Sequence, residues 1–95
     1  MENVLIIWLN GALADVAKQT VRSALSRSYS IEDRDLQQVD NGFEFIFDDE
    51  TGGNARIEFI NDDPHLSVKI TTDFSWEAIP LYDLVQDCFE DEGEA

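Results

Sequence analysis

The spacing of hydrophobic and polar positions changes several times along the chain, and each spacing predicts a different element. Residues 4–9 form a continuous apolar run, VLIIWL, which is followed by Asn10 and Gly11. A short apolar run with β-branched and aromatic members, closed by a turn signal, is typical of a strand buried on both faces. We therefore expect a strand that lies inside or beneath a sheet, with Trp8 in the core.

From residue 12 onward the spacing becomes helical. Apolar side chains recur every three or four residues, with polar ones between them, at Leu13, Val16, Ala17, Val21, Ala24 and Leu25. This pattern predicts an amphipathic helix of about four turns. We expect it to start near Asn10 as the N-cap and to end at Ser28 to Ser30, where serines weaken helix propensity.

Residues 31–39 fit neither period well. We expect a short strand ending at Val39, because Asp40-Asn41-Gly42 is a two-residue hairpin signal. Three alternating segments follow, separated by turns at 48–54 and 61–64. Their expected core positions are Phe43, Phe45 and Phe47, then Ile57 and Phe59, then Leu66, Val68, Ile70 and Thr72.

The other face of these strands carries charges that can pair across the sheet. In an antiparallel meander, Glu44 is expected opposite Arg56 and Glu58 opposite Lys69. Such pairs contribute about 0.2–1 kcal/mol each, so they favour one register more than they add stability.

Helical spacing returns after a loop or single turn at 73–77, with apolar positions at Leu81, Leu84, Val85, Cys88 and Phe89. Pro80 suits the first position of a helix, so a second amphipathic helix is expected from Pro80 through Glu90. The predicted fold class is α+β, in the order β-α-β-β-β-β-α, with a mostly antiparallel sheet and both helices on one face. We expect one domain over 1–91 and a short acidic tail over 92–95.

The composition is consistent with one small domain. Hydrophobic residues make up 43% of the 95 residues, which is enough for a single core. Cys88 is the only cysteine and cannot form an internal disulfide, and the N-terminus does not have the pattern of a secretory signal. The apolar run at 4–9 is too short to cross a bilayer. A cytoplasmic location is therefore expected.

The charge balance is strongly acidic and unevenly distributed. The chain has 21 acidic and 6 basic residues and a formal charge of −15, and nineteen of the acids lie in residues 32–95. So large a charge works against the compact state through self-repulsion. Direct binding to nucleic acid or to an anionic membrane is disfavoured, because both attract Lys and Arg. The expected partner is a basic protein.

Residues for catalysis or for a cofactor are scarce. His65 is the only histidine and follows Pro64 in an expected turn, and Cys88 lies on the apolar stripe of the last helix. Gly52-Gly53 precedes a strand rather than a helix, so it does not match a phosphate-binding loop. The segment 48–52 lacks the alternating oxygen ligands of an EF-hand. We expect no enzyme activity, no cofactor and no dedicated metal site.

Carboxylates cluster in two regions that we predict to bind the partner. One is the last helix, with Asp83, Asp87, Glu90, Asp91 and Glu94. The other is the pair of hairpin turns, with Asp48, Asp49, Glu50, Asp62 and Asp63. Carboxylates one helical turn apart are spaced by about 5–6 Å, and such a row can imitate a row of phosphates. Trp76 is the candidate aromatic anchor.

These features favour binding over catalysis. The leading hypothesis is an inhibitor that mimics nucleic-acid charge and blocks the basic DNA- or RNA-binding surface of a partner, the mode of action of phage anti-restriction and anti-CRISPR proteins. Two alternatives remain open: an immunity protein that neutralises a nuclease toxin, and an adaptor or structural subunit that binds through an exposed hydrophobic edge. Strong salt dependence of binding would separate the first two from the third.

Overall fold

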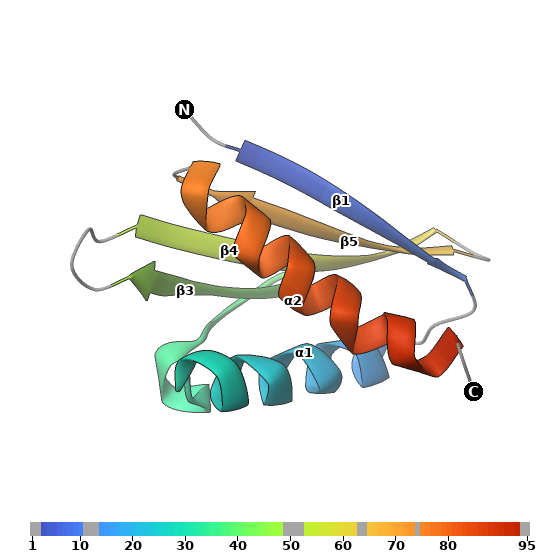
Figure 1. Ribbon diagram of the computed structural model, residues 1–95, viewed down its shortest axis with the longest axis horizontal. Helices are drawn as coiled ribbons and strands as arrows, with labels where there is room; N and C mark the ends of the chain where they lie inside the picture. Colours follow the sequence, from blue (N-terminus) through green and yellow to red (C-terminus); the bar gives the residue numbers. More distant parts are fainter. Residues whose placement is uncertain (1–2, 11–13, 49–52, 63–64, 74, 94–95) are drawn as a thin grey trace.

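The computed structural model of the chain describes residues 3–10, 14–48, 53–62, 65–73 and 75–93. In chain order the elements are β1 (Asn3–Asn10), α1 (Ala14–Tyr29), the short 3-10 helix η1 (Asp33–Asp35), β2 (Gln37–Val39), β3 (Gly42–Asp48), β4 (Gly53–Asp62), β5 (His65–Thr72) and α2 (Ser75–Gly93). The α+β class, with an antiparallel sheet of five strands and two helices, is confirmed (Figure 1).

The sheet has the strand order β1-β5-β4-β3-β2, and every neighbouring pair is antiparallel. Strands β2 to β5 form a meander, because each pairs with the next along the chain. The chain therefore enters the sheet at one edge with β1 and, after α1, re-enters at the other edge with β2 (Figure 1). Strand β1 then gains its partner only when β5 returns beside it.

The alternating segments place one side chain in two in the core, as predicted, except that Phe47, at an irregularity in the β3–β4 register, is only partly buried. Phe43, Ile57 and Ile70 lie opposite one another on β3, β4 and β5, and all three are buried. The next row joins Phe59 to Val68, which are also buried. Because side chains alternate between faces along a strand, these rows define one continuous apolar surface. The helices add to it Ala17, Val21, Ala24, Leu25, Leu81 and Val85.

Helix α1 ends within the predicted range, and its geometry shows why. Ser30 adopts a left-handed backbone conformation with φ of 58°. The Ser30 N–H donates to the Ser26 carbonyl at 3.1 Å, and the Ile31 N–H donates to the Leu25 carbonyl at 3.3 Å. The Ser30 bond is that of an αL C-cap, in which the residue after the helix takes the left-handed conformation and its N–H binds a carbonyl of the last turn. Ile31, the next residue, returns to the core.

Two predictions about α1 were wrong. Asn10 is the last residue of β1, and α1 begins at Ala14, so Asn10 is not the N-cap. Val16 was expected in the core and is exposed. The buried stripe of α1 is therefore narrower than the apolar pattern suggests. Leu13 lies outside the described residues.

Helix α2 begins at Ser75, five residues before the predicted start at Pro80. The segment 75–77 is thus helical rather than a loop. Ala78 is buried along with Leu81 and Val85, at the i, i+3 and i+7 spacing of one helix face. Burial of this face compensates for the helical hydrogen bond that Pro80 cannot donate. The helical backbone also continues past Glu90, to Gly93.

A reciprocal pair of hydrogen bonds fixes the point at which β5 ends and α2 begins. The Asp73 N–H donates to the Asn54 carbonyl at 3.1 Å, and the Asp73 carboxylate accepts from the Asn54 N–H at 3.0 Å. The junction is therefore attached to the start of β4. From there α2 runs back along the sheet and contacts β1, β5 and α1, while α1 contacts β4 (Figure 1).

Strand β1 was predicted to be buried on both faces, and this is wrong. It lies at the edge of the sheet, and only alternate side chains such as Ile7 enter the core. Val4, Ile6 and Trp8 point to the other face and are 47%, 46% and 61% exposed. In an antiparallel sheet a continuous apolar run does not require two covered faces. Among the described residues, no helix is both long enough and apolar enough to cross a membrane.

Candidate interaction surfaces

Helix α2 presents a stripe of exposed side chains opposite its buried face. Trp76, Ile79, Asp83 and Asp87 are all exposed and follow each other at spacings of three or four residues. The first half of this stripe is apolar and the second half is acidic. Asp83 and Asp87 are one helical turn apart, so their side chains are neighbours at about 5–6 Å between Cβ atoms.

The two helices differ sharply in charge. Helix α2 contains six acidic residues and no basic one, whereas α1 contains one acid, Asp15, and three bases, Lys18, Arg22 and Arg27. In the described part of the chain, no basic side chain forms an ion pair with Asp83 or Asp87. Their charges are therefore available to a partner.

The remaining predicted acidic residues are only partly placed. Glu90 and Asp91 continue the backbone of α2, and Asp48 and Asp62 end β3 and β4. For these four the structure describes the backbone but not the side chain. Three turn residues and one tail residue lie outside the described residues: Asp49, Glu50, Asp63 and Glu94.

Asp48 and Asp62, the described residues next to the two predicted acidic turns, lie at opposite ends of β4. Asp48 pairs with Gly53 at the start of β4, while Asp62 pairs with His65 at the end of the same strand. Because β4 has ten residues, these two ends are about 30 Å apart. Helix α2 starts at the end of the sheet nearer Asp48 and runs toward the end nearer Asp62 (Figure 1). The acidic half of α2 thus lies toward the end of the sheet at which β4 ends with Asp62.

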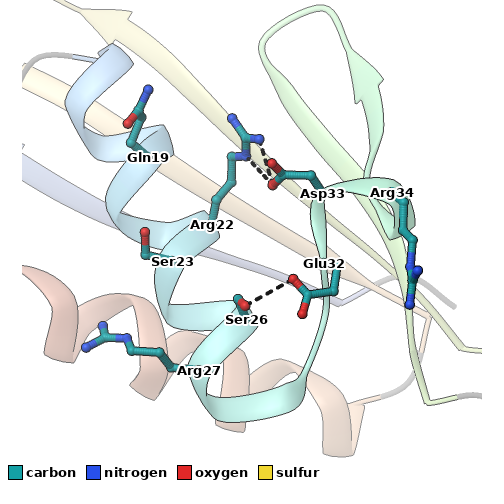
Figure 2. Close-up of a pocket in the computed structure, with 8 residues that line it drawn as sticks. All are labelled: Gln19, Arg22, Ser23, Ser26, Arg27, Glu32, Asp33 and Arg34. Atoms are coloured by element: carbon teal, nitrogen blue, oxygen red, sulfur yellow. Dashed lines mark hydrogen bonds and ion pairs between the residues drawn. The ribbon is translucent and has the colours of Figure 1, made fainter.

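A broad hollow between α1 and η1, with a volume of about 970 Å³, was not predicted from the sequence. Figure 2 shows Arg22 directed toward Asp33 across it, whereas Arg27 and Arg34 point away from this pair. The Arg22 guanidinium contacts the Asp33 carboxylate at 2.6 Å. The arginines therefore do not converge on a common point where an anion could bind.

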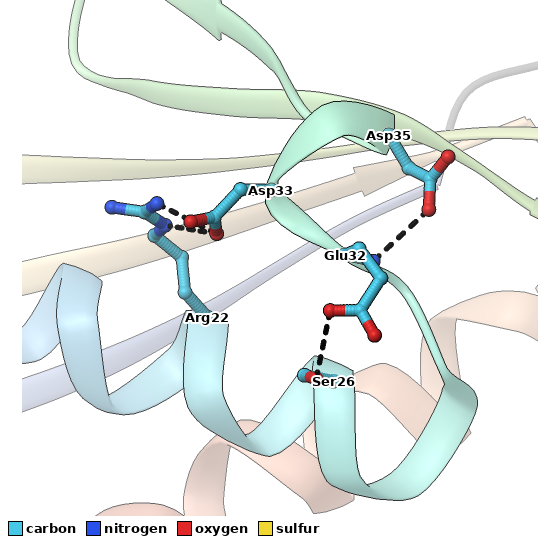
Figure 3. A network of polar contacts seen from close by, with 5 residues as sticks. All are labelled: Arg22, Ser26, Glu32, Asp33 and Asp35. Atoms are coloured by element: carbon cyan, nitrogen blue, oxygen red, sulfur yellow. Dashed lines mark hydrogen bonds and ion pairs between the residues drawn. The ribbon is translucent and has the colours of Figure 1, made fainter.

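The polar groups of the hollow instead attach η1 to α1 (Figure 3). The Ser26 hydroxyl donates to the Glu32 carboxylate at 3.3 Å, and the Glu32 N–H donates to the Asp35 carboxylate at 3.0 Å. The second bond is half of a capping box around η1. With the Arg22–Asp33 ion pair, this network holds the crossing from α1 to β2, which is a structural role.

The outer face of the sheet, opposite the core, has the predicted charge pairs at its centre. Glu44 lies opposite Arg56, and their side chains form an ion pair at 2.8 Å. Glu58 lies opposite Lys69, also as predicted.

Apolar side chains flank these pairs on the β1 side. We define the outer apolar strip as Val4, Ile6 and Trp8 on β1 together with Ile60 on β4, which shares a cross-strand row with Trp8. Sequence reasoning missed the strip because it assigned the whole run at 4–9 to the core. Nothing in the run itself distinguishes an edge strand from a central one.

The residues considered for catalysis lie in unremarkable places. His65 is the first residue of β5 and is exposed, and Cys88 is half-buried on α2. Among the side chains that the structure describes, His, Cys, Asp and Glu do not gather in groups of three or more that could hold a metal ion.

Comparison of the chain with known protein families finds no family model that matches, and comparisons with curated proteins and with solved structures find no match either. The acidic stripe of α2 and the outer apolar strip are therefore the two surfaces from which a function can be inferred.

Proposed function

We propose that the protein binds the basic nucleic-acid-binding surface of another protein through the carboxylates of α2, and thereby blocks access of DNA or RNA to that surface. The observation that carries this proposal is the exposure of Asp83 and Asp87 on a helix with six acids and no base. In the described part of the chain no ion pair neutralises either side chain.

We further infer that both helices cover the same face of the sheet, in the order predicted from the sequence. Helix α1 contacts β4, α2 contacts β1 and β5, and the helices contact each other. On this arrangement the exposed stripe of α2 faces away from the sheet. Asp83 and Asp87 would then lie next to each other along the outside of the molecule, with about 5–6 Å between their Cβ atoms.

The acids of α2 are unfavourable for stability, which supports a role in binding. Like charges at i and i+4, as at Asp83 and Asp87, repel each other by a few tenths of a kcal/mol. Carboxylates in the last turn also oppose the helix dipole, and α2 has no base there to offset them. Acidic residues that weaken the helix are expected to be retained in the sequence if they contribute to binding a partner.

The mechanism is steric competition assisted by long-range attraction. A strongly negative surface accelerates encounter with a basic one, and the acceleration falls as ionic strength rises. Once the partner is bound, the apolar half of the stripe, with Trp76 and Ile79, can contact it at short range. Exposed tryptophans are frequent anchors of protein interfaces.

An immunity protein that neutralises a nuclease toxin would use the same surface. The two functions differ in the identity of the partner, a nucleic-acid-binding protein in one case and a toxin in the other. Identification of the captured partner therefore distinguishes them.

The experiment is capture from a cell lysate at low salt with three immobilised proteins: the wild type, Asp83→Asn/Asp87→Asn, and the control Asp15→Asn/Asp40→Asn. Both double variants remove two exposed carboxylates and change the net charge equally. We expect the α2 variant to lose the partner and the control to retain it. Equal loss of the partner by the α2 variant and the control would show that binding depends only on net charge. Retention of the partner by both variants would show that α2 is not the binding surface.

A further inference from the structure

The strand β1 is an edge strand without the usual protection. Natural edge strands are shielded by charges, by proline, by bulges or by being very short. Residues 3–10 read NVLIIWLN, with no charge and no proline, and pair with β5 in an unbroken register from Asn3 to Asn10. The opposite edge, β2, is only three residues long. Within the described residues, β1 is therefore the one long edge open to strand pairing.

Three exposed apolar side chains lie on this edge strand. Val4, Ile6 and Trp8 are three of the nine large apolar side chains that are exposed among the described residues. All three are on the outer face of the sheet, where Ile60 extends the outer apolar strip. Exposed apolar surface of this kind marks interaction sites.

We propose that β1 pairs with β1 of a second copy of this chain, antiparallel about a two-fold axis perpendicular to the sheet, so that the two sheets become one. Residues directly opposite each other across two strands point to the same face. The hydrophobic cores of the two copies must lie on the same side of the joined sheet. This requires that any two residues directly opposite each other across the two β1 strands have residue numbers with an even sum. This requirement leaves few registers for a strand of eight residues.

The register centred on Ile6 fits the side chains best. It sets Ile6 against Ile6 of the second copy and Val4 against Trp8, so all three exposed apolar side chains of β1 have an apolar partner. On the core side it sets Leu5 against Ile7. The register centred on Ile7 would leave Val4 opposite Asn10, and is less favourable.

The charge distribution permits a second copy at this edge. Two molecules with a charge of −15 repel each other. Strand β1 carries no charge, and its neighbour β5 presents His65, Ser67, Lys69 and Thr71 on the outer face, with no acid among them. Pairing through β1 thus joins the two chains without setting carboxylates against carboxylates on that face.

The dimer does not depend on the proposed function, and salt separates the two. Higher ionic strength screens the repulsion between copies, so self-association is maintained or strengthened. Binding of a basic partner is weakened by the same change. Because the axis is perpendicular to the sheet, both α2 helices would lie on one side and present two acidic stripes together.

The test is the mass of the protein in solution, measured by light scattering after size-exclusion chromatography. We expect the wild type at twice the chain mass of 10.8 kDa. Ile6→Lys sets two lysines against each other at the axis and should give a monomer. The control is Ile46→Lys on β3, since Ile46 is 51% exposed on the outer face compared with 46% for Ile6, and it should remain dimeric.

A mixing experiment tests the register and guards against a variant that simply fails to fold. Ile6→Lys and Ile6→Glu should each be monomeric alone and form a dimer when mixed, because opposite charges then meet at the axis. A monomeric wild type would overturn the proposal. So would a dimeric Ile6→Lys protein, equal dissociation of Ile46→Lys, or a mixture that stays monomeric.

Discussion

Trp8 and His65 lie side by side on the outer face of the sheet, with ring centroids 6.4 Å apart and ring planes at 81°. Trp8 is 61% exposed although it belongs to the longest apolar run of the chain. The run therefore divides its side chains between the core and a surface. That division is the reason β1 is a candidate for pairing rather than an ordinary buried strand.

The environment of Trp8 should respond to self-association. In a Trp76→Phe background Trp8 is the only tryptophan, and the proposed register places Val4 of the second copy opposite it. We expect acrylamide to quench its fluorescence more strongly when Ile6→Lys is added, because the monomer leaves the ring more accessible. Ile46→Lys in the same background is the control and should leave quenching unchanged. Equal quenching in all three proteins would argue against burial of Trp8 in a dimer.

The orientation of α2 can be tested through stability. Leu81 is fully buried and Ile79, two residues before it, is exposed. Leu81→Ala is expected to lower the free energy of unfolding by about 2–5 kcal/mol through loss of buried surface and creation of a cavity. Ile79→Ala should change it by no more than about 0.5 kcal/mol. Urea titrations measure both changes, and the Ile6→Lys background is used so that dimerisation does not affect the comparison. Similar losses in the free energy of unfolding for Leu81→Ala and Ile79→Ala would contradict the orientation of α2.

Gly42 allows the close approach of β3 to β4. A Cβ at this position would overlap the carbonyl oxygen of Ile57 and lie 2.9 Å from the Cα of Glu58, and both are backbone atoms that cannot rotate away. Gly42→Ala should therefore destabilise the fold by about 1–3 kcal/mol, as overpacked positions do. Gln38→Ala on the exposed neighbouring strand is the control. An unchanged midpoint of unfolding for Gly42→Ala would contradict this prediction, because it would mean that β3 and β4 can move apart enough to fit the Cβ at no cost in stability.

The acids of α2 should lower stability in the absence of a partner. Asp83→Asn/Asp87→Asn removes a repulsive i,i+4 pair, so the free energy of unfolding is expected to rise by a few tenths of a kcal/mol. The stability of the wild type should also rise from low to moderate salt, because screening weakens self-repulsion. Denaturation curves at two salt concentrations measure both effects. A destabilised double variant would indicate that these carboxylates have a structural role.

The parts of the fold that could be predicted are the strands in which apolar and polar residues alternate, because this alternation determines which side chains face the core. Phe43, Ile57, Phe59 and Val68 alternate with polar residues, so their burial follows from the period of a strand. The pairing of Glu44 with Arg56 followed from the same register. These features depend on neighbours in sequence or on adjacent hairpins.

The parts that could not be predicted depend on which elements meet in space. The run of β1 is compatible with a central or an edge strand, and its position is decided by β5, about sixty residues later. The start of α2 was misjudged because Pro80 was taken as a first helical residue, although Ala78, Leu81 and Val85 already share the helical spacing. The acidic stripe of α2 was visible in the sequence, but its separation from the turn at Asp48 was not.

In the proposed function, α2 occupies the surface on which a partner binds nucleic acid. The most direct test is competition: the captured partner is held on the immobilised protein at low salt, and duplex DNA or RNA is added in increasing amounts. We expect nucleic acid to release the partner, and we expect that partner already bound to nucleic acid is not captured. A ternary complex, in which the partner holds nucleic acid and this protein at the same time, would contradict the proposed function.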